Sequence, residues 1–278
     1  LSGCVSNFCT PVEQARIGLD TSEYDEGLDR SEGKISKLGG LIKNGLATAA
    51  KVGVTAIGAA SAAVGALVKS SVESYAEYEQ LVGGVETLFK DSADAVMGYA
   101  STAYKTAGMS ANEYMETVTS FSASLLQSLG GDTAKAAEVA DMAITDMSDN
   151  ANKMGTDMEM IQNAYNGFAK ANFTMLDNLK LGYGGTKEEM QRLLDDATKL
   201  SGVEYDINSF NDIAQAIHVV QTELDITGTT AKEASSTISG SLASAKSAWE
   251  NLVVGISDDS ANFDSLIDNF VESVSTAA

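Results

Sequence analysis

The chain has 278 residues, of which 44 % are hydrophobic and only 6 % aromatic, and its formal net charge is −21. A chain of this length can bury a sizeable core in one large or two small domains. The charge is unevenly placed, because residues 1–72 hold equal numbers of basic and acidic side chains and residues 73–278 carry the whole excess of acid. Such a surface repels phosphate, so we expect no direct nucleic-acid binding by residues 73–278.

Residues 1–36 are predicted to form an irregular N-terminal segment that then becomes weakly helical. Within it, Arg16–Asp20 alternates apolar and polar residues and could pair as a short strand with something outside this chain. Cys4 and Cys9 are the only cysteines, too few for a disulfide framework, and nothing near them completes a metal site. The first residue is not Met, so we expect a fragment or a processed form.

Residues 37–72 are expected to form a Gly/Ala-rich apolar helix flanked by lysines, and Val52–Val68 contains no charge. Small residues at four-residue spacing let helices approach closely in water or in lipid. Two interpretations stay open: a close-packed helix in a self-associated bundle, or conditional membrane insertion near the lower length limit. Ala and Gly drive insertion poorly, which favours the bundle. The residues of this close-packing or membrane face are Gly45, Ala49, Gly53, Gly58, Ser61, Ala62, Gly65 and Ala66.

Residues 73–257 are predicted to be an acidic helical core module. Ser/Thr-x-x-Glu boxes recur there, each just after a glycine. The hydroxyl of such a box can accept from an amide of the first helical turn while the Glu reaches back, and glycine ends the preceding helix. The uneven spacing of the boxes excludes a solenoid repeat. The predicted cap pairs are Ser110 and Glu113, Thr156 and Glu159, Thr186 and Glu189, and Thr230 and Glu233.

The fold class that follows is all-α: a multi-helix module of short amphipathic helices joined by glycine stops and capping boxes, preceded by the Gly/Ala-rich hydrophobic helix. Asn163–Leu194 reads as helix, glycine-rich elbow and helix. Strand signals are nearly absent, and Val203–Ile207 is the best short candidate. Residues 258–278 are expected to start a further helical segment that is cut short.

Apolar spacing also predicts details of this module. A helix over Ser70–Phe89 should bury Val72, with a possible kink at Gly83-Gly84. Asp91 or Ser92 is expected to cap the next helix. Trp249 is interpreted as a core anchor.

Signals of enzymatic chemistry are poor. His218 is the only histidine and stands mid-helix between apolar residues, so we interpret it as a satisfied or partly exposed helix residue. A catalytic triad or a histidine metal site would need partners that this chain does not offer. Carboxylate pairs such as Asp195-Asp196 are typical of a solvated acidic face. We therefore predict no enzyme, no catalytic or metal-binding residue and no cofactor.

Six segments, in one order, resemble the core region of phage tail tape-measure proteins from long-tailed phages and prophages of Gram-positive bacteria. The resemblance covers roughly residues 70–259 and, more loosely, residues 15–41. The segments are Tyr78–Phe89, Thr106–Ser110, Ser120–Leu126, Asp146–Gly155, Asp177–Gly185 and Ile226–Thr230.

The resemblance implies a scaffolding protein of tail assembly, here its N-terminal piece. Such proteins are largely helical, organise polymerisation of the tail-tube protein, set tail length and leave the tube at infection. It implies tail assembly chaperones and tail-tip or baseplate proteins as partners, self-association in low copy number, and a possible contact with the host membrane. The implied location is the lumen of the tail tube in the virion, and the host cytoplasm during assembly.

The many joints between helices suit a folded module better than a straight rod, so we expect this piece to position or nucleate assembly and to add little to measured length. A membrane-active secreted helical toxin or pore-forming protein, using the helix over residues 38–69, is the alternative. A cell-wall hydrolase would need a site that this stretch does not offer.

Overall fold

The computed structural model describes residues 30–31, 33–38, 64–236 and 238–277. These residues form α-helices and two short 3₁₀ turns, with no strand among them, which confirms the all-α class. The elements are α3 (Val64–Phe89), η3 (Lys90–Ser92), α4 (Ala93–Thr106), α5 (Ala111–Ser128), α6 (Thr133–Met154), α7 (Met158–Phe168), η4 (Leu176–Leu179), α8 (Lys187–Ser201), α9 (Phe210–Glu223), α10 (Thr229–Ser236), α11 (Ile238–Ser257) and α12 (Phe263–Ala277). Residues 30–31 and 33–38 are also helical.

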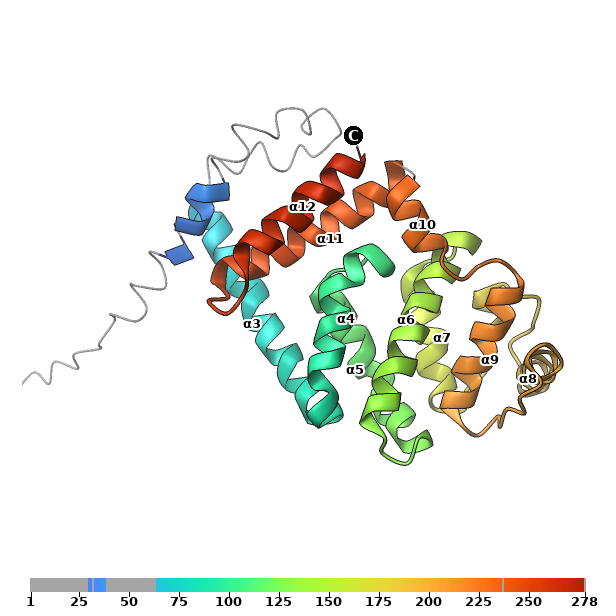
Figure 1. Cartoon of the computed structure of the whole chain (residues 1–278). Coiled ribbons are helices and arrows are strands. Elements are labelled where there is room, and N and C mark those ends of the chain that lie inside the picture. Colours follow the sequence, from blue (N-terminus) through green and yellow to red (C-terminus); the bar gives the residue numbers. More distant parts are fainter. Residues whose placement is uncertain (1–29, 32, 39–63, 237, 278) are drawn as a thin grey trace, which may run out of the picture.

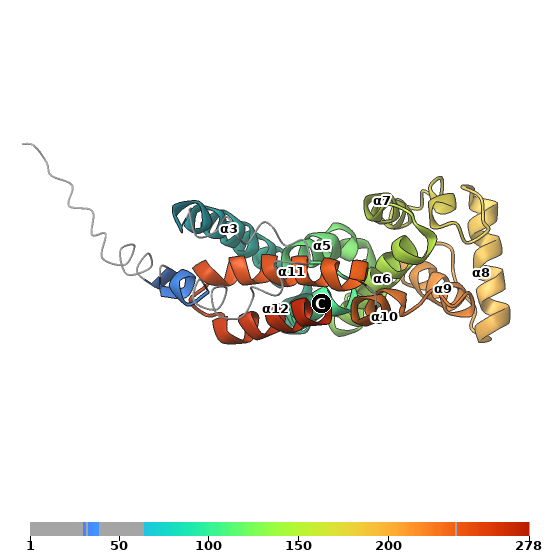
Figure 2. The ribbon, with the colours of Figure 1, turned by 90° about the horizontal axis from the view of Figure 1, so that it is seen from above.

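The helices surround two hydrophobic cores. The larger core is built from α3 to α9, with α6 packed against α4, α5, α7 and α9 (Figure 1). The smaller core lies between α11 and α12 and includes Ile35 and Leu38 of the N-terminal helical residues. The α11–α12 pair lies across the ends of α3 and α4, and α8 stands at the far end of the molecule from it (Figures 1 and 2).

Local capping chemistry explains several helix ends. At α5 the Ser110 side chain accepts from the amide of Glu113 while the Glu113 carboxylate accepts from the amide of Ser110, which is a capping box. Gly155 and Gly202 end α6 and α8 with φ of 61° and 75°, a left-handed conformation that costs glycine little. The turn between α3 and α4 differs from expectation, because Ser92 precedes α4 without a side-chain cap hydrogen bond.

The structure describes only part of residues 1–72, and there the boundary predicted for the Gly/Ala-rich helix needs correction. Residues 30, 31 and 33–36, at the end of the segment expected to become weakly helical, are helical. The end of the predicted Gly/Ala-rich helix belongs to α3, which runs from Val64 to Phe89 and is continuous through Gly83-Gly84. Gly65 and Ala66 lie in its first turn, whereas the predicted face from Gly45 to Ala62, like the strand proposed at Arg16–Asp20, falls outside the described residues.

Two further expectations were wrong, and a third is confirmed in part. Val72 is 53 % exposed rather than buried, and Ser71 beside it faces the interior instead. Residues 203–206 have no regular secondary structure, so the strand candidate is a loop between α8 and α9. Residues 263–277 are helical, as expected: they form α12, whose apolar side chains pack on α11.

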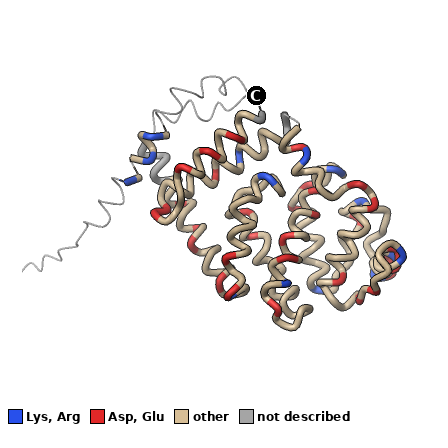
Figure 3. Tube along the Cα trace, viewed as in Figure 1, with Lys and Arg blue, Asp and Glu red and all other residues tan. Residues whose placement is uncertain are grey.

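Acidic side chains are spread over most of the helices, while lysines and arginines are sparse (Figure 3). In the part of the chain that the structure describes, no helix combines the length and apolarity that crossing a membrane requires. Trp249 is half-buried and its ring lies 5.4 Å from that of Phe270. It therefore contributes to the smaller core from its edge.

Candidate functional site

The second half of α6 carries polar side chains on its buried side. Asp146, Ser148, Asp149 and Asn150, here called the polar junction, are between 0 and 7 % exposed. Buried polar groups destabilise a fold unless they find hydrogen-bond partners. The partners of these four residues therefore show what the junction does.

Asp149 holds the start of α10 from a different helix. One carboxylate oxygen accepts from the amide of Gly228 at 2.5 Å and the other from the amide of Thr230 at 2.8 Å. Amides in the first turn of a helix have no partner within that helix, and a negative charge there also favours the helix dipole. Asp149 thus acts as the N-terminal cap of α10 across the interior of the protein.

Ser148 and Asn150 extend the junction to two loops. The Ser148 hydroxyl donates to the carbonyl of Ala107 between α4 and α5 at 2.7 Å, and it contacts the Thr230 hydroxyl at 3.1 Å. The Asn150 side-chain amide donates to the carbonyl of Leu179 in η4 at 2.9 Å. One turn of α6 therefore fixes the backbone of three segments that are distant in sequence.

Asp146 joins α6 to α9 through His218. The His218 Nδ1 atom lies 2.9 and 3.0 Å from the two carboxylate oxygens of Asp146. The hydrogen bond to Asp146 raises the pKa of His218, although partial burial opposes it. Burial raises the pKa of Asp146, and His218 acts in the opposite direction. Because the two groups are in direct contact, the geometry favours a protonated His218 imidazole paired with an ionised Asp146 carboxylate.

Within the described residues, no hydroxyl or thiol is hydrogen-bonded to this pair. Asp146 is the only hydrogen-bond partner of His218 in the described part of the chain, so no hydroxyl or thiol is placed for activation. The interpretation of His218 as a partly exposed, satisfied helix residue agrees with its contacts, and its side chain is 35 % exposed. Across the described ranges, no group of three or more His, Cys, Asp or Glu side chains could hold a metal ion.

The centre of the junction is not fully satisfied. The Tyr165 hydroxyl, the Asn150 side-chain oxygen and both polar atoms of the Gln221 amide are buried with no hydrogen-bond partner among described residues. Burial and the nearby Asp146 raise the pKa of Tyr165 well above its usual value. Because such groups are costly to bury, this part of the fold trades stability for a specific arrangement of polar atoms.

A cavity of about 680 Å³ opens next to the junction, between α5, α6, α7, α10 and α11. Ser148 and Thr230 contribute to its wall. Small, apolar and hydroxyl residues make up part of the remaining lining, and its carboxylate and amide residues are Glu113, Glu116, Glu159, Glu233, Asn152, Gln162, Asn163 and Asn166. This chemistry suits hydrogen bonding to a polar or cationic surface and lacks a nucleophile–base pair.

Two of the predicted capping residues occupy other roles. α7 begins one residue later than expected, with Asp157 accepting from the amide of Glu159, and the Thr156 hydroxyl donates instead to the carbonyl of Asn178. At α10, Thr230 is already inside the helix and Asp149 caps its amide. A remote carboxylate has replaced the local hydroxyl, which no local pattern reveals.

In the elbow, only one of the two hydrogen bonds of the predicted capping box between Thr186 and Glu189 is present. The Thr186 hydroxyl accepts from the amide of Glu189 at 3.2 Å, whereas the Glu189 carboxylate accepts from Gly184 at 3.0 Å. Arg192 also contacts Glu189 and stacks over the Tyr183 ring at 4.3 Å. The Arg192 guanidinium, followed by the Gly184 amide, lowers the pKa of Glu189 to about 2.

The sequence reasoning missed the polar junction, although a signal was present. In α6, Ala136, Ala140 and Ala143 mark the buried face, and Asp146 and Asn150 continue it in phase at helical spacing. Polar residues in the phase of an apolar stripe indicate buried hydrogen bonds. Their partners, however, lie tens of residues away and only the fold identifies them.

Comparison with known proteins gave no match: no protein-family model fits this chain, and neither curated proteins nor solved structures contain a significant relative.

Proposed function

We propose that this chain is a structural protein of phage tail assembly of the tape-measure kind, acting as a folded module that organises polymerisation of the tail-tube protein. One observation carries the proposal: four of the six segments with tape-measure resemblance meet at the polar junction. Asp146–Gly155 supplies the junction itself. The segments that it contacts are Thr106–Ser110 through Ala107, Asp177–Gly185 through Leu179, and Ile226–Thr230 through Gly228 and Thr230.

This convergence supports a resemblance in architecture. Segments that are far apart in the chain and unremarkable in composition are those that set where α6, α9 and α10 lie. A scaffold depends on the positions of its helices, whereas an enzyme depends on a reactive group. The contacts of the junction are of the first kind, because they join side chains mainly to backbone amides and carbonyls.

The proposed role is to position or nucleate assembly, with little contribution to ruler length. A continuous helix converts residues into length at about 1.5 Å each. Here the longest described helix, α3, has 26 residues, and the chain folds back at successive turns (Figure 1). The acidic exterior fits a partner surface that is not nucleic acid, and the proposed partners are the tail-tube protein, the assembly chaperones and the tail-tip or baseplate proteins.

The test is an in-frame deletion of residues 64–277 in the phage or prophage that encodes the chain, with tails viewed by electron microscopy. The proposal predicts that tails fail to assemble. If residues 64–277 instead set tail length as an extended helix, tails would still form and would be shorter by roughly 320 Å, at about 1.5 Å per residue. Assembled tails with such a shortening would refute the proposal, as would tails of unchanged number and length.

A point variant separates assembly from length. Asp149→Ala should reduce the number of tails without changing the length of those that form, because it perturbs the junction and leaves the residue count unchanged. The matched control is Asp195→Asn at an exposed carboxylate of α8, which should leave tail number and length at wild-type values.

A further inference from the structure

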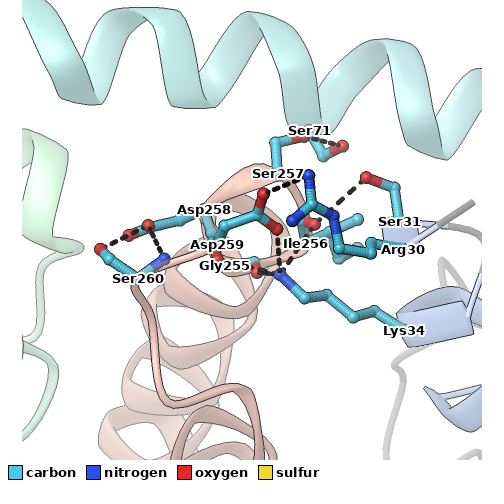
Figure 4. A network of polar contacts seen from close by, with 10 residues as sticks. All are labelled: Arg30, Ser31, Lys34, Ser71, Gly255, Ile256, Ser257, Asp258, Asp259 and Ser260. Carbon is cyan, nitrogen blue, oxygen red and sulfur yellow. Dashed lines mark hydrogen bonds and ion pairs between the residues drawn. The ribbon is translucent and has the colours of Figure 1, made fainter. Parts of the chain in front are cut away.

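The N-terminal helical residues 30–31 and 33–38 contact the corner between α11 and α12, which comprises residues 255–264. The ammonium group of Lys34 donates to three backbone carbonyls there, those of Gly255, Ile256 and Asp258, at 3.0, 3.2 and 2.9 Å. Figure 4 shows the Lys34 side chain reaching from its helix to this group of oxygens. The Ser31 hydroxyl donates to the same Ile256 carbonyl at 3.4 Å.

The corner is a natural site for a cation. α11 ends at Ser257, so its last carbonyls have no partner within the helix and stand at the negative end of the helix dipole. Asp259 follows directly and lies 3.0 Å from Arg30 and 3.8 Å from Lys34. Lys37 also pairs with Asp264 of α12. Basic side chains on one face of the N-terminal helix thus meet acidic and carbonyl oxygens.

Two buried aliphatic side chains accompany these charges. Ile35 and Leu38 are buried in the smaller core, where Ile256 and Phe263 also lie. Lys34 passes over the Phe263 ring with its nitrogen 5.7 Å from the centroid. A helix of this length is not stable alone in water, so leaving the corner and losing helical structure are a single event.

We propose that residues 30–38 are a releasable strap, which docks on the α11–α12 corner through Lys34 and opens as a unit when that charge is neutralised or screened. The contacts given above reach only residues 255–264 and the smaller core, so α6 and its polar junction should stay folded when the strap opens. Regions held by few buried contacts open at lower cost than the core. Opening would therefore detach this helix from the α11–α12 corner without unfolding the module. This inference is independent of the proposed function.

Hydrogen–deuterium exchange of the full chain, followed by mass spectrometry, tests the strap. The variant is Lys34→Met, which keeps an unbranched side chain and removes the charge. At low salt, peptides covering residues 33–38 should exchange at least tenfold faster in this variant than in the wild type, with α6 unchanged. Wild-type protein in 1 M NaCl should change in the same direction. The matched control is Lys232→Met on the exposed side of α10, with no effect at residues 33–38.

Two outcomes would overturn the strap. If Lys34→Met leaves exchange at residues 33–38 unchanged, the carbonyl contacts do not hold this helix. If residues 33–38 and α6 accelerate together, the helix is an integral part of one cooperative unit. A second variant, Asp259→Asn, should accelerate residues 33–38 less than Lys34→Met, because it leaves the three carbonyl contacts in place.

Discussion

The polar junction on α6 and the α11–α12 corner both use charge to join distant segments, but in opposite surroundings. At the junction Asp149 is fully buried and both its oxygens accept from backbone amides. At the corner the ion pair between Arg30 and Asp259 is about half exposed on each side. A buried charge with a missing partner is costly, whereas an exposed pair contributes little. The first region should therefore be rigid and the second adjustable.

The largest effect is expected from removing the carboxylate of the junction. Asp149→Ala leaves the amides of Gly228 and Thr230 without their acceptor. It should lower the free energy of unfolding by about 3 kcal/mol, the lower end of roughly 1.5–3 kcal/mol for each charge-assisted hydrogen bond, because Gly228 is exposed and Thr230 is partly exposed. Urea unfolding followed by circular dichroism measures it. The exposed control Asp195→Asn should change stability by less than about 0.5 kcal/mol. A loss below 1 kcal/mol for Asp149→Ala would remove the contrast between the two regions.

Glycine substitutions compare how tightly the corner is packed with how tightly the elbow, another part of the larger module, is packed. A Cβ at Gly185, in the elbow, would overlap the backbone carbonyl of Thr174, whereas a Cβ at Gly255, in the corner, would overlap the end of the Leu266 side chain. Backbone cannot move aside cheaply, but a leucine can change rotamer. Gly185→Ala should therefore cost about 3 kcal/mol and Gly255→Ala about 1 kcal/mol or less. Equal losses in urea unfolding would show that the corner is as tightly packed as the elbow.

The polar junction and the corner also show which features of the structure could be predicted from the sequence. The all-α class, the Ser110 capping box and the stop at Gly155 depend on neighbouring residues, and a local pattern was enough to predict them. The cap of α10 depends on Asp149, which is about 80 residues away in the chain, so local reasoning assigned it to Thr230 instead. The docking of residues 30–38 was missed for the same reason.

The stability that the Asp146–His218 pair contributes is expected to depend on pH. The pKa of His218 is raised by Asp146, so the pair adds stability that is fully present below the unfolded pKa of about 6.5 and is lost as pH rises through the higher folded value. The raised pKa of the buried Asp146 acts in the same direction, at lower pH. Urea unfolding should therefore show greater stability at pH 6 than at pH 8.5, by about 1 kcal/mol or less because His218 is partly exposed.

His218→Gln provides the control for that titration. It retains a side-chain donor toward Asp146 and removes the titrating group, so the difference in stability between pH 6 and pH 8.5 should shrink. Asp149 on α6 and Tyr165 on α7 also face this pair, and neither adds a positive charge that could substitute for His218. A wild-type protein that gains stability between pH 6 and pH 8.5 would contradict the assignment.

The smallest effect is expected from an ion pair at the surface. Lys105 of α4 and Glu272 of α12 lie 2.8 Å apart, and their side chains are about as exposed as those of the ion pair between Arg30 and Asp259. Glu272→Gln should change stability by about 0.5 kcal/mol or less, and 0.5 M NaCl should reduce that change further. A double-mutant cycle with Lys105→Met isolates the pair. A coupling well above 1 kcal/mol would mean that exposed charges hold α12 in place, and the special role assigned to Lys34 on its backbone carbonyls would then lose its physical basis.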